Sequence, residues 1–174
     1  DHAHEGVDPH AWLDPVNAQR WLAVIADTLA AADPEHAAAY RANQRIAQTT
    51  IDTLISNTNA SLAPVSKRPF IVFHDAYQYF ETDFDLPAAG AISLSDATDP
   101  SPARIVEIQG RVRAEGIDCV LTEPQFNPGI VATELERTEA KTGVSVPIGA
   151  TLEPGPTLYP QLIRNLATSL AECL

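Results

Sequence analysis

The first helix is predicted by hydrophobic residues that recur every three or four positions after an Asp-Pro pair. Asp14 is a good N-cap residue, and Pro15 suits the first helical position, where its missing N–H is not needed. Leu22, Ile25 and Leu29 then fall on one face of the helix. The pattern therefore predicts an amphipathic helix that starts at residue 15.

A second and longer helix is predicted after Asp33-Pro34, which repeats the same start signal. Small and apolar residues recur at helical spacing, and no Gly or Pro interrupts the chain before Pro64. The prediction is one helix of about 27 residues within 34–63, roughly 40 Å long at 1.5 Å per residue. A helix of this length can act as a stiff connector between two lobes.

From Pro69 onward, apolar runs alternate with helical patterns. The runs predict strands at 70–73, 88–94, 117–122 and 144–148. Three helices are predicted in this part of the chain: one from 99–102 to Gly116, one from 127 to Gly143, and a final one that buries Leu162, Leu166 and Leu170. Repeated strand-then-helix units indicate an α/β fold, with a parallel sheet flanked by helices on both faces.

The composition narrows the possible functions. The 174 residues are enough for one domain with a sizeable core, and no apolar run is long enough to span a bilayer. The formal net charge of −12 disfavours nucleic acid and anionic membrane surfaces as partners, and it is compatible with collecting cations. The chain has no methionine and opens on Asp1, so we interpret it as a processed or trimmed product.

The candidate metal ligands lie where strands end. His74 follows the strand 70–73 and Glu123 follows the strand 117–122, so both are expected at the carboxyl edge of the sheet, where α/β proteins bind ligands. His10 lies on the loop before the first helix, and a cleft between two lobes would bring it to His74. Two histidines and a carboxylate would supply three of the four ligands that zinc prefers.

Each of these residues also has an ordinary structural interpretation. If His74 is considered alone, a histidine that is hydrogen-bonded in the core is the favoured interpretation, and His10 alone is explained as a residue that faces solvent. Glu123 can ligate a metal, orient a ligand histidine or accept backbone hydrogen bonds.

Motifs of several enzyme classes are absent. The sequence has no G-x-S-x-G, no P-loop, no G-x-G-x-x-G and no H-E-x-x-H. A zinc-dependent hydrolase, with Glu123 or Asp75 as general base, is the alternative from a different functional class.

The two cysteines, Cys119 and Cys173, do not form a C-x-x-C pair. They are either two separate buried thiols or one disulfide, which would indicate an oxidising compartment.

Four segments, in order along nearly the whole chain, resemble the periplasmic high-affinity zinc-binding proteins of ABC uptake systems. They are Asp8–Pro15, Phe73–Tyr77, Glu123–Phe126 and Leu162–Leu174. The resemblance implies two α/β lobes joined by a long rigid helix, with the metal ion bound between the lobes. It implies a receptor, not an enzyme, that captures Zn(II) in the periplasm and delivers it to the membrane permease of an ABC transporter.

The same resemblance implies a division of the chain and a set of ligands. Residues 1–33 match the end of the amino-terminal lobe, 34–63 the connector helix, and 64–174 the carboxy-terminal lobe; the rest of the amino-terminal lobe is expected to be missing. His10 and His74 match metal ligands, with Glu123 as a further contributor or as a support for a ligand. Manganese-binding relatives usually carry Glu at the second histidine position, so histidine favours zinc, with manganese or another divalent metal as the alternative.

Three further features come from the resemblance. Cys119 and Cys173 match cysteines that zinc-binding members join in a disulfide, and His2 and His4 match the end of a histidine-rich loop. Many members carry an Asp before a Pro-Leu-Gly near the end of the chain, where this sequence has Val146, which cannot ligate. We therefore predict that this chain alone binds zinc weakly, or with water or a neighbouring molecule completing the ligand shell.

Overall fold

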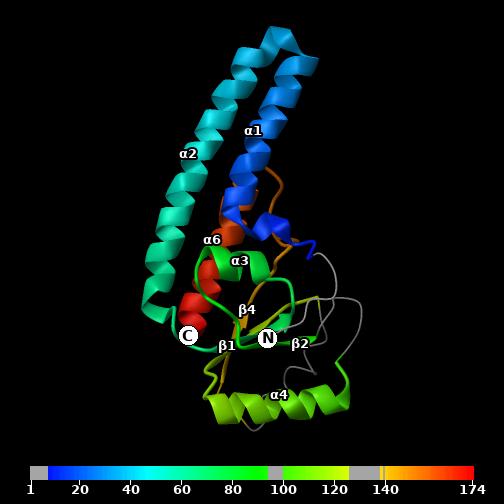
Figure 1. The fold of residues 1–174 in the computed structure, drawn as a ribbon, viewed down its shortest axis with the longest axis vertical. Helices are drawn as coiled ribbons and strands as arrows, with labels where there is room; N and C mark the ends of the chain where they lie inside the picture. The colour runs from blue at the N-terminus through cyan, green and yellow to red at the C-terminus, as the bar shows by residue number, and fades with distance from the viewer. Residues whose placement is uncertain (1–7, 94–99, 126–137, 139) are drawn as a thin grey trace.

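The computed structural model describes residues 8–93, 100–125, 138 and 140–174. Two long helices, α1 (Pro15–Ala32) and α2 (Ala37–Leu62), form an antiparallel hairpin that projects from an α/β unit (Figure 1). The 3-10 turn η1 (Ala11–Leu13) precedes the first helix, and η2 (Pro34–His36) joins the two. Among the described residues, no helix is both long enough and apolar enough to cross a bilayer.

The predicted start of α1 is confirmed. The Asp14 carboxylate accepts hydrogen bonds from the backbone N–H groups of Val16 (2.6 Å) and Asn17 (3.2 Å). These bonds satisfy two of the donors that a helix start leaves without an intrahelical partner. The long second helix is also confirmed: α2 has 26 residues, and it begins at Ala37 because the three residues before it form η2.

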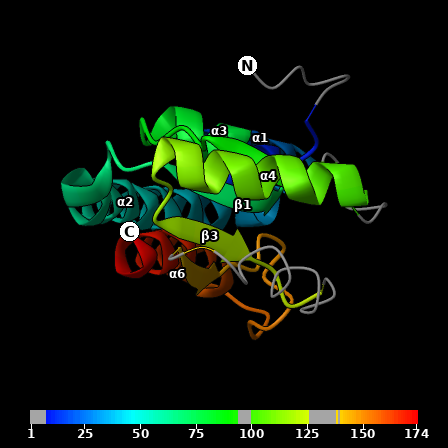
Figure 2. The same ribbon diagram turned by 90° about the horizontal axis from the view of Figure 1, so that it is seen from below.

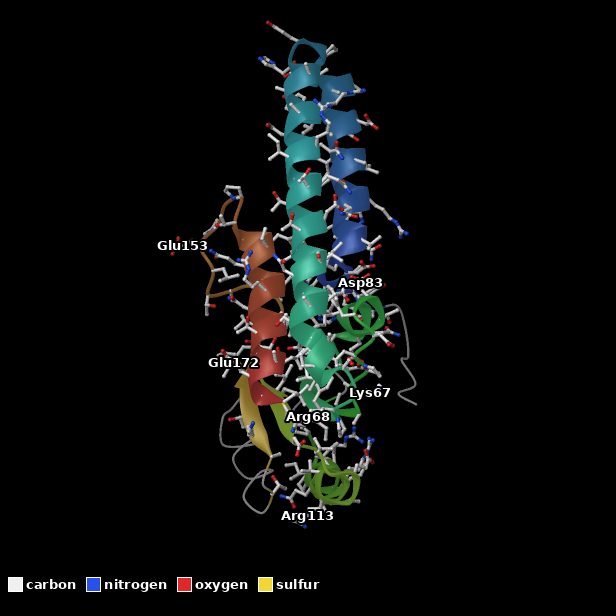
Figure 3. All side chains as sticks on the ribbon, turned by 90° about the vertical axis from the view of Figure 1, so that its left-hand side faces the viewer. Lys67, Arg68, Asp83, Arg113, Glu153 and Glu172 are labelled. Atoms are coloured by element: carbon white, nitrogen blue, oxygen red, sulfur yellow. A yellow bond between two sulfur atoms is a disulfide. The ribbon has the colours of Figure 1, made fainter. Side chains whose placement is uncertain are left out.

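The predicted apolar face of α1 is largely exposed. Ile25 is 53% exposed and Leu29 is 42% exposed, whereas α1 buries Pro15, Ala26 and Ala30. Figure 3 shows that side chains project from the far half of the hairpin with no third element beside it. The periodicity of the helix was therefore a good guide to its structure, but the described residues do not cover its apolar face.

Four parallel strands form one sheet in the order β2-β1-β3-β4. The strands are β1 (Phe70–His74), β2 (Gly90–Ser93), β3 (Cys119–Thr122) and β4 (Lys141–Val144). The remaining helices among the described residues are η3 (Ala63–Val65), α3 (Gln78–Asp83), α4 (Pro102–Glu115) and α6 (Leu158–Cys173). The predicted fold class, α/β with a parallel sheet flanked by helices, is confirmed.

Strand β1 shows how the sheet divides the core. Phe70 and Val72 belong to a cluster shared with α2 and α6, whereas Ile71 and Phe73 belong to a second cluster with apolar residues of α4. Successive side chains of a strand point to opposite faces, which produces this division. Figure 2 shows α4 and α6 on opposite sides of β3. Because helices cover both faces, all five residues of β1 are buried, including His74 at its end.

The end of the sheet differs from the prediction. The sequence pattern places the last strand over 144–148, but β4 spans Lys141–Val144. Gly143, which the sequence predicted to stop a helix, lies inside this strand. A Cβ atom at this position would lie 2.8 Å from Leu121 Cδ2 and 2.9 Å from Ser169 Oγ. Glycine allows this close approach of the strand to α6. The predicted helix that starts at residue 127 falls mostly outside the described residues.

Cys119 and Cys173 form a disulfide. It joins the first residue of β3 to the last residue of α6, two positions that are 54 residues apart in the sequence. The pairing that the resemblance implied is confirmed, and the alternative of two separate thiols is excluded.

Candidate metal centre

His74 is the last residue of β1 and is only 4% exposed. Its Nδ1 lies 2.6 Å from Oε1 of Glu123, the residue that follows β3. Since β1 and β3 are paired and parallel, their carboxyl ends meet at one edge of the sheet, as the sequence predicted for these two residues. The second carboxylate oxygen of Glu123 accepts a hydrogen bond from Gln125 Nε2 at 2.7 Å. Both oxygens of Glu123 are thus engaged, and one of them orients His74.

His10 lies directly before η1, and its side chain is 12% exposed. Its Nδ1 lies 2.6 Å from Oδ1 of Asp8, and the same oxygen accepts a hydrogen bond from the His10 backbone N–H at 2.9 Å. The Asp8 side chain is only 5% exposed. Asp8 therefore does for His10 what Glu123 does for His74. Sequence reasoning missed this role, although the two-residue spacing from Asp8 to His10 was a signal that could have revealed it.

The two histidine rings lie side by side, with centroids 5.4 Å apart and planes at 66°. A carboxylate at Nδ1 favours the tautomer in which Nδ1 carries the proton and Nε2 carries the lone pair. Two imidazoles that bind one tetrahedral zinc ion through Nε2 would have centroids about 5 Å apart, given Zn–N bonds of about 2.0–2.1 Å. The spacing of His10 and His74 is compatible with a shared metal ion.

Two buried hydroxyl groups, those of Tyr77 and Ser145, belong to the same region of the α/β unit. Tyr77 is 2% exposed, and its ring centroid is 6.2 Å from that of His74. Burial raises the pKa of Tyr77 well above its ordinary value, and the nearby charge of Glu123 raises it further. Ser145, in the turn after β4, is 3% exposed. Within the described part of the chain, neither hydroxyl makes a hydrogen bond of good geometry. The motif Phe73–Tyr77 includes Tyr77, but nothing in the sequence pointed to Ser145.

The remaining predicted residues are less informative. Asp75 follows His74 out of the strand and is partly buried. Val146 is also partly buried, between Ser145 and Pro147. His2 and His4 lie outside the described residues. Over the ranges that the structure describes, no three His, Cys, Asp or Glu side chains are grouped closely enough to hold a metal ion. The candidate centre among these residues is therefore limited to the two imidazoles and the carboxylates at their Nδ1 atoms.

The fold is similar to that of solved metal-binding proteins. A Zn(II)-bound mutant variant of AdcAII from Streptococcus pneumoniae matches with a TM-score of 0.78 and 27% identity, over 96% of this chain and 61% of that chain. The parallel sheet flanked by helices and the long helical hairpin are the fold that this chain shares with these metal-binding proteins.

Sequence comparison gives the family within this class. The model of the ZnuA family, whose description is zinc-uptake complex component A periplasmic, matches residues 1–173 of this chain. High-affinity zinc uptake system protein ZnuA of Brucella abortus (strain 2308) is 51% identical over 167 residues, which are 96% of this chain and 50% of that protein. The ZnuA of Paracoccus denitrificans (strain Pd 1222) is 42% identical over 170 residues, 97% of this chain and 52% of that protein. The chain belongs to the ZnuA family and spans about half the length of the curated relatives it matches.

Proposed function

We propose that this chain is the zinc-binding part of a periplasmic receptor that captures Zn(II) and delivers it to the membrane permease of an ABC transporter. The observation that carries the proposal is the pair His10 and His74. Their ring centroids are 5.4 Å apart, and each ring has a buried carboxylate at Nδ1. Imidazole suits zinc better than manganese, which prefers oxygen ligands. Zn(II) is therefore the proposed cargo, and manganese or another divalent ion is the alternative.

The arrangement also supports a binding role over a hydrolytic one. A zinc hydrolase needs a base beside an open coordination position. Glu123, the stronger candidate for that base, has one oxygen at His74 Nδ1 and the other at the Gln125 side chain. In this role Glu123 raises the basicity of a ligand and fixes its orientation. We propose that the chain is not an enzyme.

We further propose that residues 1–33 complete an amino-terminal lobe, that 34–63 is the connector and that 64–174 is the carboxy-terminal lobe. An apolar groove of about 680 Å³ runs between α1, α2 and the start of α6. Among the residues that line it are Trp21, Ile25 and Ile46, which are 44%, 53% and 68% exposed. Apolar surfaces of this kind usually pack against protein. The part of the relatives that this chain does not match is the proposed occupant.

The test is a zinc titration of the unmodified chain and of single variants, by competition with a chelator of known affinity. We expect one zinc ion per chain, and His10→Gln and His74→Gln to weaken binding at least 100-fold, because each leaves a single imidazole. Val146→Asp is expected to strengthen binding about tenfold by restoring the acid that the family resemblance places there.

His36→Gln is the matched control for the two histidine variants. His36 also has a carboxylate at Nδ1, Asp33 Oδ2 at 2.8 Å, but it lies exposed at the far end of the hairpin. Its substitution should leave zinc affinity unchanged. Equal losses in all three glutamine variants, or stoichiometric binding that survives in the variants of His10 and His74, would refute the proposed site.

A further inference from the structure

Trp12 makes two hydrogen bonds with residues of the sheet unit, by which we mean the α/β unit formed by residues 64–174. Its indole Nε1–H donates a hydrogen bond to the backbone carbonyl of Pro147 at 2.8 Å, across 135 positions of sequence. Its own backbone carbonyl accepts a hydrogen bond from the Tyr159 hydroxyl at 2.9 Å, across 147 positions. Pro147 lies in the turn after β4, and Tyr159 lies in the first turn of α6. Trp12 is therefore fixed both through its side chain and through its backbone.

His10 is close to Trp12 both along the backbone and through its ring. Trp12 belongs to η1, whose first turn is closed by a 3.0 Å hydrogen bond from Leu13 N–H to the His10 carbonyl. The rings of His10 and Trp12 meet edge to face, with centroids 5.2 Å apart. His10 thus has backbone and ring contacts with the turn that Pro147 and Tyr159 hold in place.

The opposite histidine is positioned by other groups. His74 is set by strand β1 and by Glu123, and neither of these takes part in the hydrogen bonds of Trp12. The distance between the two rings therefore depends on how firmly the loop of His10 is tied to the sheet unit. The two hydrogen bonds of Trp12 contribute polar contacts to this connection.

We propose that Tyr159 is a positioning residue for the metal centre, which acts through Trp12 to hold His10 at binding distance from His74. This inference rests on the proposed function, because it assigns Tyr159 a role in the same zinc site. Tyr159 did not stand out in the sequence, since its contact with Trp12 spans 147 positions.

The Tyr159 hydroxyl is suited to a permanent donor role. Burial raises the pKa of Tyr159 above its ordinary value, and the carboxylates of Asp14 and Asp83 raise it further. A phenol with a raised pKa stays protonated throughout the neutral pH range, so it keeps the proton that the Trp12 carbonyl accepts.

The test compares Tyr159→Phe with the unmodified chain and with Tyr40→Phe as the control. Tyr40 also donates a 2.9 Å hydrogen bond, to Asp33, but at the far end of the hairpin. We expect Tyr159→Phe to weaken zinc binding about tenfold, the lower end of the range for outer groups that orient metal ligands. Tyr40→Phe should stay within about twofold of the unmodified chain. Trp12→Phe, which removes the donor to Pro147, should act in the same direction as Tyr159→Phe.

Nitrogen NMR of the histidine rings separates positioning from general loss of structure. In zinc-free Tyr159→Phe, the ring signals of His10 should shift while those of His74 stay in place; partial unfolding would move both. If the unmodified chain binds no zinc, the proposed function fails, and the role of Tyr159 fails with it. If the chain binds zinc through His10 and His74 but Tyr159→Phe binds equally well, only the positioning role is overturned.

Discussion

Breaking the disulfide between Cys119 and Cys173 should lower the free energy of unfolding by about 4 kcal/mol. The bridge closes a segment of 54 residues. In the chain-entropy account, opening a loop of that length gives the unfolded chain freedom worth about 4 kcal/mol at 25 °C. Both residues are buried, at 0% and 4% exposure, so the folded state should keep its packing when the bond opens. The loss is large beside the roughly 5–15 kcal/mol by which domains are usually stable.

The assay is urea unfolding of the chain with and without reductant, followed by circular dichroism. The reduced chain should unfold at lower urea, and with a larger m-value, because its unfolded state is less compact. The double variant Cys119→Ala/Cys173→Ala is the control, since it has no bond to break and should not respond to reductant. A loss below about 1 kcal/mol on reduction would show that the unfolded chain is already restricted by other means. An equal response of the double variant would show that the reductant acts elsewhere.

Two further substitutions test packing and charge. Gly143→Ala should destabilise the protein by about 1–3 kcal/mol in urea unfolding, because its Cβ would lie 2.8 Å from Leu121 Cδ2; Gly110→Ala, with open space in a helix, should be neutral or stabilising. Burial, and then the charge of Asp14, raise the pKa of Asp83, which is labelled in Figure 3. Asp83→Asn should therefore raise the melting temperature at pH 7, through a gain of at most about 1 kcal/mol in the free energy of unfolding. Because the pKa of Asp83 is raised in the folded state, this residue lowers the stability of the protein as pH rises above its ordinary pKa of 3.8. The unmodified chain and Asp83→Asn should therefore melt alike near pH 3. A higher melting temperature of Asp83→Asn that persists at pH 3 would contradict the charge argument.

The sequence predicted elements well where local chemistry determines structure. Asp14 caps α1 as expected, and Gly116 ends α4 in the left-handed conformation, with φ of 63°. The prediction failed at β4, an edge strand in which Lys141, Thr142 and Val144 are exposed. Such a strand lacks the apolar run that identifies β1. The apolar run that follows it lies in the turn beyond the sheet.

Some residues of the candidate site could likewise be placed from the sequence, and others could not. His74 and Glu123 could be placed together from the sequence because parallel strands share an edge. His10 could be placed there only through its motif, since no local pattern brings a loop before a helical hairpin to the end of β1. Trp12 belongs to the same motif, but no motif includes Tyr159. Their contact depends on how α6 meets the hairpin, which neither spacing nor periodicity encodes.

The two carboxylates beside the histidine pair bear on the proposed zinc site. Asp8 and Glu123 are 5% and 0% exposed in their side chains, and each is hydrogen-bonded to a ring nitrogen. Zinc requires neutral imidazoles, and two neutral rings leave an ionised carboxylate beside them without a counter-charge. Buried charge without a counter-charge is strongly unfavourable. An ion of charge +2 bound by His10 and His74 would offset the charge of two ionised carboxylates at this place. The same carboxylates that orient the rings therefore also favour the ion, which joins the geometric and the electrostatic arguments for a metal centre.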